Sequence, residues 1–269
     1  MLEDNHEDII TKALRGQGVG KSAIAERANV ERSVIDRILR GEVLEDVIAC
    51  IAPVLGLSAE KLLISARKAW SPKPVELTGL KRFESDFGEM SVSAYIVCEQ
   101  DSRKAWIFDT GTDCNSLISF IEEDGLKVDS ILLTHTHRDH IYCLDQLKCK
   151  FPSANIYVHK DESIEQVTQI EDGFQLSLHS LKLIALHTHG HSAGGLTYLI
   201  EGLPCPVAIV GDALFAGSMG GGMVSYQDAL QTNREKIMTL PDNCVLCPGH
   251  GPMTTVGEEK KYNPFFPEF

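Results

Sequence analysis

The chain has 269 residues, of which 43% are hydrophobic and 23% charged, and this composition is typical of a globular protein large enough for two domains. No stretch approaches the roughly 18 apolar residues of a membrane span, and the acidic start lacks the pattern of a secretory signal. We therefore expect a cytoplasmic protein that does not contact membranes. Residues 1–70 carry 10 basic and 11 acidic side chains, while the remainder carries 15 and 27, so most of the net charge of −13 lies after residue 70. An acidic domain repels polyanions, which argues against nucleic acid as its substrate.

The eight cysteines do not predict a disulfide framework, because the chain is far longer than a small disulfide-stapled scaffold. Most lie in apolar contexts, so we expect buried, reduced thiols. Cys244 and Cys247 have CxxC spacing, but a single such pair is a weak zinc signal and this one falls in a predicted strand.

The first 70 residues are predicted to be helical with short breaks. Gly41 suits a helix C-cap that needs a positive φ, and Ser58 suits an N-cap. The predicted helices cover residues 7–15, 21–28, 31–40, 46–55 and 59–70. The two prolines of Ser71–Pro74 then interrupt helical structure. We therefore divide the chain into an all-α domain (1–70), a linker (71–76) and a second domain (77–269).

After the linker, short apolar segments alternate with helical ones. Predicted strands cover residues 94–98, 105–109, 130–134, 155–159, 181–186, 196–201, 207–210 and 243–247. Predicted helices cover residues 115–124, 141–150 and 227–240. Several of these strands are almost continuously apolar, as strands covered on both faces are. This alternation predicts an α/β architecture.

The strand that ends at Thr134 is followed by His135-Thr-His137-Arg-Asp139-His140. Alternate residues of an extended segment face the same side, so His135 and His137 can bind one cation together. Asp139 and His140 fall where the chain bends into a helix and can face a second cation. Imidazole and carboxylate are ligands that zinc, iron and manganese accept, so the segment predicts a metal centre.

Three further segments place ligand-type residues just past the end of a predicted strand. They contain His191 (in His-Thr-His-Gly-His-Ser), Asp212 (in Val-Gly-Asp-Ala) and His250 (in Cys-Pro-Gly-His-Gly). The ends of strands are the usual position of functional groups in α/β proteins. Each segment is a weak signal alone, but the four in series predict two adjacent metal sites.

The order HxHxDH, His, Asp, His closely resembles that of the metallo-β-lactamase-fold hydrolases over residues 75–266. The resemblance implies an α/β sandwich of four layers, αββα, that holds two divalent metal ions, with zinc favoured and iron or manganese as alternatives. His135, His137 and His191 would hold the first metal, and Asp139, His140 and His250 the second, with Asp212 as the bridge. Asp109, in an Asp-Thr-Gly turn, would orient metal-binding histidines. His187 and His189 would lie outside the ligand set.

The ligand set implies hydrolysis by a metal-activated hydroxide, with Asp139 as the catalytic group that orients this nucleophile or takes its proton. The segment Gly211–Ser218 resembles the glyoxalase II-like branch, which favours a small ester, thioester or lactone as substrate. Met219–Met223 stands where that branch commonly has Gly-Arg, and the basic carboxyl-terminal helices that bind glutathione are lacking, so glutathione thioesters are disfavoured. The predicted pocket residues are Tyr142, Cys143, Met219, Met223 and Tyr226, although packing in the core is an equal alternative for Tyr142.

Residues 19–41 resemble the helix-turn-helix of λ-repressor/Cro-like proteins. This resemblance implies contacts to DNA by Lys21, Arg32, Ser33 and Arg37 and a homodimer as the functional unit. The mixed charge of the second helix and the net charge of −1 oppose DNA binding, so a docking or dimerisation module is the alternative. The leading hypothesis is thus a dinuclear hydrolase with a small-molecule substrate. The runner-up is a transcription regulator whose hydrolase-like domain senses a metal or ligand.

Overall fold

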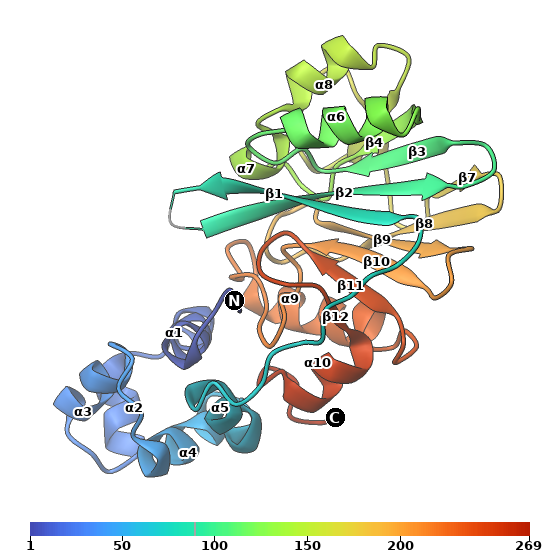
Figure 1. The fold of residues 1–269 in the computed structure, drawn as a ribbon. Coiled ribbons are helices and arrows are strands. Elements are labelled where there is room, and N and C mark those ends of the chain that lie inside the picture. The colour runs from blue at the N-terminus through green and yellow to red at the C-terminus, as the bar shows by residue number, and fades with distance from the viewer. Residues whose placement is uncertain (89) are drawn as a thin grey trace.

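The amino-terminal part of the protein is entirely helical. The computed structural model describes residues 1–88 and 90–269 and shows this part below the sheets (Figure 1). The helices are α1 (His6–Gln17), α2 (Lys21–Arg27), α3 (Arg32–Ile38), α4 (Glu45–Val54) and α5 (Ala59–Ala66). The predicted N-cap is present, because the Ser58 hydroxyl accepts a hydrogen bond from the Lys61 amide. Gly41 has the expected positive φ of 90°, but α3 ends earlier, with Leu39 as its C-cap. The last helix ends before residue 70, because Lys68 adopts a φ of 51°.

The described residues that follow form two six-stranded sheets. The first has the order β1 (Leu80–Phe87), β2 (Met90–Glu99), β3 (Lys104–Phe108), β4 (Lys127–Leu132), β5 (Asn155–His159) and β6 (Thr168–Ile170). The second has the order β12 (Thr254–Thr255), β11 (Val245–Pro248), β10 (Val207–Gly211), β9 (Leu196–Glu201), β8 (Leu181–His187) and β7 (Gln175–Leu178). Trp106 and Phe108 of the first sheet share a buried cluster with Tyr198 and Val207 of the second, so the sheets pack face to face.

Helices cover the outer faces of both sheets, which gives the four layers that the family resemblance implied (Figure 1). On the first sheet lie α6 (Asn115–Glu123), α7 (Arg138–Ile141) and α8 (Leu144–Lys150). On the second lie α9 (Tyr226–Thr232), a π-helical turn (Asn233–Ile237) and α10 (Val256–Tyr262). The sequence predicted one helix over 141–150 and another over 227–240, but each is two segments. It also missed β1, a largely polar strand whose residues are all exposed or partly exposed.

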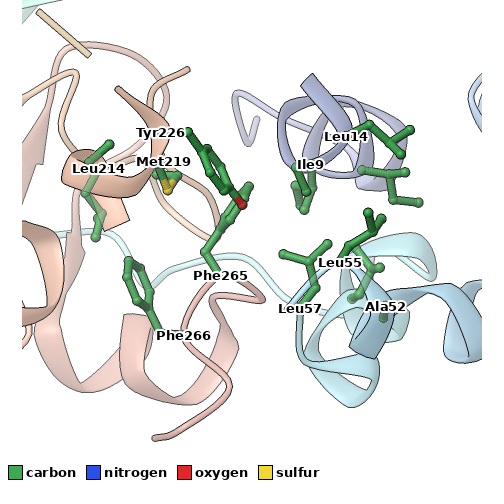
Figure 2. Close-up of a cluster of buried hydrophobic side chains, with 14 of the residues drawn as sticks. Ile9, Leu14, Ala52, Leu55, Leu57, Leu214, Met219, Tyr226, Phe265 and Phe266 are labelled. Carbon is green, nitrogen blue, oxygen red and sulfur yellow. The ribbon is translucent and has the colours of Figure 1, made fainter. Parts of the chain in front are cut away.

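One hydrophobic cluster joins the amino-terminal helices to the helical face of the second sheet (Figure 2). Ile9 and Leu57 lie on one side of this interdomain cluster, and Tyr226, Phe265 and Phe266 lie on the other. Two hydrogen bonds also connect the two parts. Lys61 Nζ donates to the carbonyl of Phe266 at 2.6 Å, and the Ser58 amide donates to the carbonyl of Pro264 at 2.9 Å. The predicted linker therefore separates the two parts in sequence, but one apolar core contains residues from both.

A methyl group at Gly16 is expected to weaken this docking. A Cβ atom there would lie 2.2 Å from Cγ of Tyr226, although Gly→Ala inside a helix ordinarily stabilises it by about 0.5–1 kcal/mol. We expect Gly16→Ala to lower the free energy of unfolding by about 1–3 kcal/mol, the usual cost of overpacking. Urea titration measures the change. Gly20→Ala, where a Cβ would meet no atom within 4 Å, is the control. Equal stability of the two variants would contradict the packing of Tyr226 on α1.

All eight cysteines are free, as predicted, but Cys50 and Cys149 are exposed rather than buried, because each lies on the outer side of its helix. Among the residues that the structure describes, no helix is both long and apolar enough to cross a membrane.

Candidate metal centre

The structure brings the seven predicted metal ligands together in two adjacent groups. One group contains His135, His137, His191 and Asp212, and the other contains Asp139, His140 and His250. Within each group one candidate ligand atom per residue lies within 4.8 Å of the others. The segments that carry them are far apart in sequence and meet at one edge of the two sheets.

Each group is positioned by loops that begin where a strand ends. His135 and His137 follow β4, and His191, Asp212 and His250 follow β8, β10 and β11. Gly249 is required at this point, because a Cβ there would lie 2.3 Å from Asp212 Oδ1 and 2.5 Å from His140 Cε1. At Gly220 a Cβ would lie 1.8 Å from the Asp212 carbonyl oxygen. The two glycines let the backbone pack tightly against Asp212, Gly249 against its carboxylate and Gly220 against its carbonyl.

Asp212 lies between the two groups. Its Oδ1 is 3.3 Å from His140 Nε2, and its Oδ2 is 3.3 Å from His191 Nε2 and 3.5 Å from His250 Nε2. Asp139 Oδ2 lies 3.2 Å from His250 Nε2. On the other side, His191 Nε2 and His137 Nδ1 are 3.0 Å apart. The Asp212 carboxylate therefore contacts histidines of both groups, as a bridging ligand requires.

Burial and mutual charge perturb the pKa values of these side chains. Burial lowers the pKa of His135 well below its usual value, and the charge of His140 lowers it further. Burial also opposes the charged form of His140, but the carboxylates of Asp212 and Asp109 outweigh it and raise that pKa well above the usual value. Despite burial, the nearby histidines hold the pKa of Asp212 well below its usual value. His135 and the Asp212 carboxylate are thus in the protonation states that bind metals, whereas His140 would have to release a proton when a metal binds.

Three of these side chains have buried polar atoms without a hydrogen-bond partner in the described part of the chain. They are His135 Nε2, His140 Nε2 and Asp212 Oδ1. Unpartnered buried polar atoms cost free energy, and natural proteins seldom leave them so. Since all three point into the two groups, the donor set fits divalent cations held by imidazole and carboxylate.

Backbone and carboxylate oxygens fix the orientation of the histidines. Asp109, at a φ of 54°, places Oδ2 at 2.8 Å from His140 Nδ1 and 2.7 Å from Thr134 Oγ1, which is 3.0 Å from His135 Nδ1. Asp109 therefore contacts one predicted ligand directly and another through Thr134. Two carbonyls act in the same way, because His191 Nδ1 lies 2.9 Å from the Gly221 oxygen and His250 Nδ1 lies 2.7 Å from the Ser91 oxygen.

Removal of the Asp109 carboxylate is expected to weaken metal binding by about 10- to 100-fold, the usual effect of losing a group that orients a metal-binding histidine. The Asp109→Ala variant, titrated with zinc against a competing chelator, measures this. Asp145→Ala, which removes an exposed carboxylate on α8, is the control. An unchanged zinc affinity in Asp109→Ala would contradict the role of this residue.

Glu162 is a buried residue of the site that the sequence analysis did not identify. Its Oε2 accepts hydrogen bonds from the amide and the hydroxyl of Thr136, and its Oε1 accepts one from the Gly194 amide at 2.9 Å. This carboxylate thus ties the loop of His135 and His137 to the loop of His191. The only sequence signal was its place just past a strand end, which it shares with the ligands.

His187 and His189 lie outside both groups. His187 forms a third cluster of possible ligands with His159 and Asp161. However, the rings of His159 and His187 are stacked 4.0 Å apart at 15°, so their in-plane lone pairs run side by side instead of converging on one ion. Nε2 of His187 donates to the Ala193 carbonyl at 2.9 Å, which makes this histidine part of the loop structure.

The predicted pocket residues have three different environments. Tyr142 and Met223 are exposed, and Tyr142 lines a pocket of about 570 Å³ with its ring 5.5 Å from the Arg138 guanidinium. Cys143 is buried in the cluster beneath α6 and α8. Met219 and Tyr226 are buried in the interdomain cluster instead of lining the pocket. They lie in the core because the amino-terminal helices cover them, which the local sequence could not indicate.

The four residues predicted to contact DNA are each close to a carboxylate. Lys21 Nζ is 2.7 Å from Asp36 Oδ1, and Arg32 Nε is 3.9 Å from Asp36 Oδ2. The other pairs are Arg37 with Glu42 and the Ser33 hydroxyl with Glu31. These carboxylates would compete with phosphate groups for the same cations. DNA binding by this region stays a prediction.

Comparisons with known proteins agree with the fold. The family model described as the metallo-beta-lactamase superfamily matches residues 87–250. The chain is 32% identical over 208 residues to the probable metallo-hydrolase YqgX of Bacillus subtilis, a match that covers 68% of this chain and 95% of that protein. It is 30% identical over 190 residues to the hydroxyacylglutathione hydrolase GloC of Haemophilus influenzae, with coverages of 61% and 88%. The crystal structure of the BLEG-1 B3 metallo-beta-lactamase superposes with a TM-score of 0.59 at 28% identity, covering 70% of this chain and 99% of that one.

The fold and the two groups of histidine and aspartate define a metal-dependent hydrolase. The chain belongs to the metallo-beta-lactamase superfamily, with relatives that include a hydroxyacylglutathione hydrolase. The amino-terminal helices lie outside the residues that the family model matches.

Proposed function

We propose that the protein is a dinuclear hydrolase that cleaves a small ester, thioester or lactone. The observation that carries this proposal is the position of Asp212, whose two oxygens face two separate groups of histidines. The name of the GloC relative supports acyl transfer to water, since a hydroxyacylglutathione is a thioester. The Met219–Met223 segment favours a substrate other than a glutathione thioester, because it lacks the arginine common in that branch.

Two divalent cations held by the seven ligands would supply Lewis-acid activation of water and of the scissile carbonyl. Side chains of the protein would handle the nucleophile and its proton and hold the metal ligands in position. Asp139, which is almost fully buried and 3.2 Å from His250 Nε2, would orient the nucleophilic water and take its proton. Asp109 and Glu162 hold the ligand-bearing loops in place. Zinc is our proposed metal, with iron and manganese as alternatives that the same ligands accept.

The test combines elemental analysis with a substrate panel. The purified protein is expected to contain two metal ions per chain and to hydrolyse at least one class among esters, thioesters, lactones and the β-lactam nitrocefin. His135→Ala should abolish that turnover. Fewer than one metal per chain after loading would rule out the dinuclear centre. Metal-free protein with full turnover would rule out metal-dependent catalysis.

A further inference from the structure

The amino-terminal segment of the chain, Met1–Asn5, lies against a loop of the metal centre. A Cβ atom on Gly251, the residue after His250, would lie 3.2 Å from the Glu3 amide nitrogen and 3.3 Å from Glu3 Cβ. The Glu3 backbone therefore packs directly on the segment that carries a metal ligand. Burial raises the pKa of Glu3, and the charges of His250, Asp4, Lys12 and Asp212 also act on it, so the carboxyl group is within electrostatic reach of the site.

Asp4 anchors this segment. Its Oδ2 accepts a hydrogen bond from the Ser218 hydroxyl at 2.5 Å and forms an ion pair with Lys12. Lys12 Nζ also donates to the Met219 carbonyl at 2.9 Å and lies 4.9 Å from the centre of the Phe215 ring. Asp4 is buried and its charge is balanced by Lys12, so it acts as an attachment point.

The contact with the metal centre continues through Phe215, whose ring packs edge-on against that of His250 at 5.6 Å. Helix α1, which begins directly after the segment, is held by the interdomain cluster through Ile9 and Leu14 (Figure 2). A capping box between Asn5 and Asp8 fixes the start of that helix. The position of Glu3 is thus determined from both sides.

Glu3 differs from Asp4 in its charge balance. The ion pairs found in residues 1–88 and 90–269 include Asp4 with Lys12 but none with Glu3. On the side of Tyr142, the pocket of about 570 Å³ is also lined by the carboxylates of Glu84, Asp86 and Asp113. Of these, Glu84 is paired with Arg82. The pocket beside Tyr142 therefore carries negative charge.

We propose that Glu3 forms part of the substrate site and selects acyl substrates that carry a positive charge near the scissile bond, such as an amine-bearing ester, thioester or lactone. This inference rests on the proposed hydrolase function. An unpaired carboxylate at the edge of a partly desolvated site attracts cations and repels anions, and opposite charges a few ångströms apart there change affinity by about tenfold. The amino-terminal helical region would then take part in substrate selection, because this region presents Glu3.

The experiment compares matched substrates that differ only in a terminal ammonium or carboxylate group, with the metal-loaded full-length protein at pH 8 and low salt. We expect the ratio of kcat/KM for the cationic to the anionic substrate to exceed one, to fall about tenfold in Glu3→Gln and to invert in Glu3→Lys. The ratio should also fall as salt is added. Glu123→Gln, which removes the same charge from the exposed face of α6, should leave the ratio as it is in the native protein.

An equal ratio in the native protein and in Glu3→Gln, with turnover intact, would overturn the inference and leave the hydrolase proposal standing. If no substrate is hydrolysed, the proposed function fails instead. In that case calorimetric binding of an amine-bearing and a carboxylate-bearing product analogue to the metal-loaded protein decides the inference. The amine should bind about tenfold more tightly than it does to Glu3→Gln, and equal binding to both proteins would reject the role of Glu3.

Discussion

Asp212→Ala is expected to reduce the metal content of the protein from two ions per chain to one or fewer and to lower kcat/KM by about a thousandfold. The carboxylate is the group that faces both sets of histidines. Without it, no carboxylate lies between the histidines of the two groups, so the repulsion between two adjacent dications is no longer offset there. The loss of one Lewis acid is worth several kcal/mol of transition-state stabilisation, and each 1.36 kcal/mol is a factor of ten in rate.

Elemental analysis and turnover of the best panel substrate measure these two effects together. Asp145→Ala, which removes an exposed carboxylate of α8, is the control and should retain two ions per chain. Melting curves of the metal-free proteins show whether Asp212→Ala remains folded. Retention of two tightly bound ions together with native turnover would contradict the bridging role of Asp212.

Tyr226→Ala is expected to lower the free energy of unfolding by about 3–5 kcal/mol, the usual cost of truncating a buried aromatic side chain. The Tyr226 side chain is only 6% exposed, and it lies in the interdomain cluster with Phe265 (Figure 2). Its loss should leave a cavity beneath α1 and loosen the docking of the amino-terminal helices. Urea titration gives the stability change, and hydrogen exchange of the α1 amides reports the loosening.

Two variants serve as controls for this result. Tyr226→Phe keeps the ring and should cost no more than about 1 kcal/mol. Tyr142→Ala removes the same side chain at a site that is 56% exposed and should change stability by at most about 0.5 kcal/mol. If Tyr226→Ala instead raises KM at native stability, the residue is a wall of the pocket, as the sequence alone suggested.

The metal centre was predictable because the sequence around each ligand has a recognisable local pattern. Each of the four segments contains an unusual polar residue directly after an apolar strand, and strands that end at one edge of a sandwich bring such residues together. Asp109 was found for a similar reason, since Asp-Thr-Gly is a distinctive turn. Glu162 was missed, because its function consists of three hydrogen bonds to two other loops and its own segment has no distinctive pattern.

The amino-acid sequence by itself determined the α/β sandwich, the preceding helices and the chemistry of the metal ligands, since hydrophobic periodicity and side-chain type are local properties. Only the tertiary structure decided what the helices cover. Met219 and Tyr226 became core residues, and Glu3 came to lie against Gly251, because the helices dock on the second sheet. Burial and proximity of this kind depend on segments from opposite ends of the chain, and no pattern within one segment encodes its distant partner.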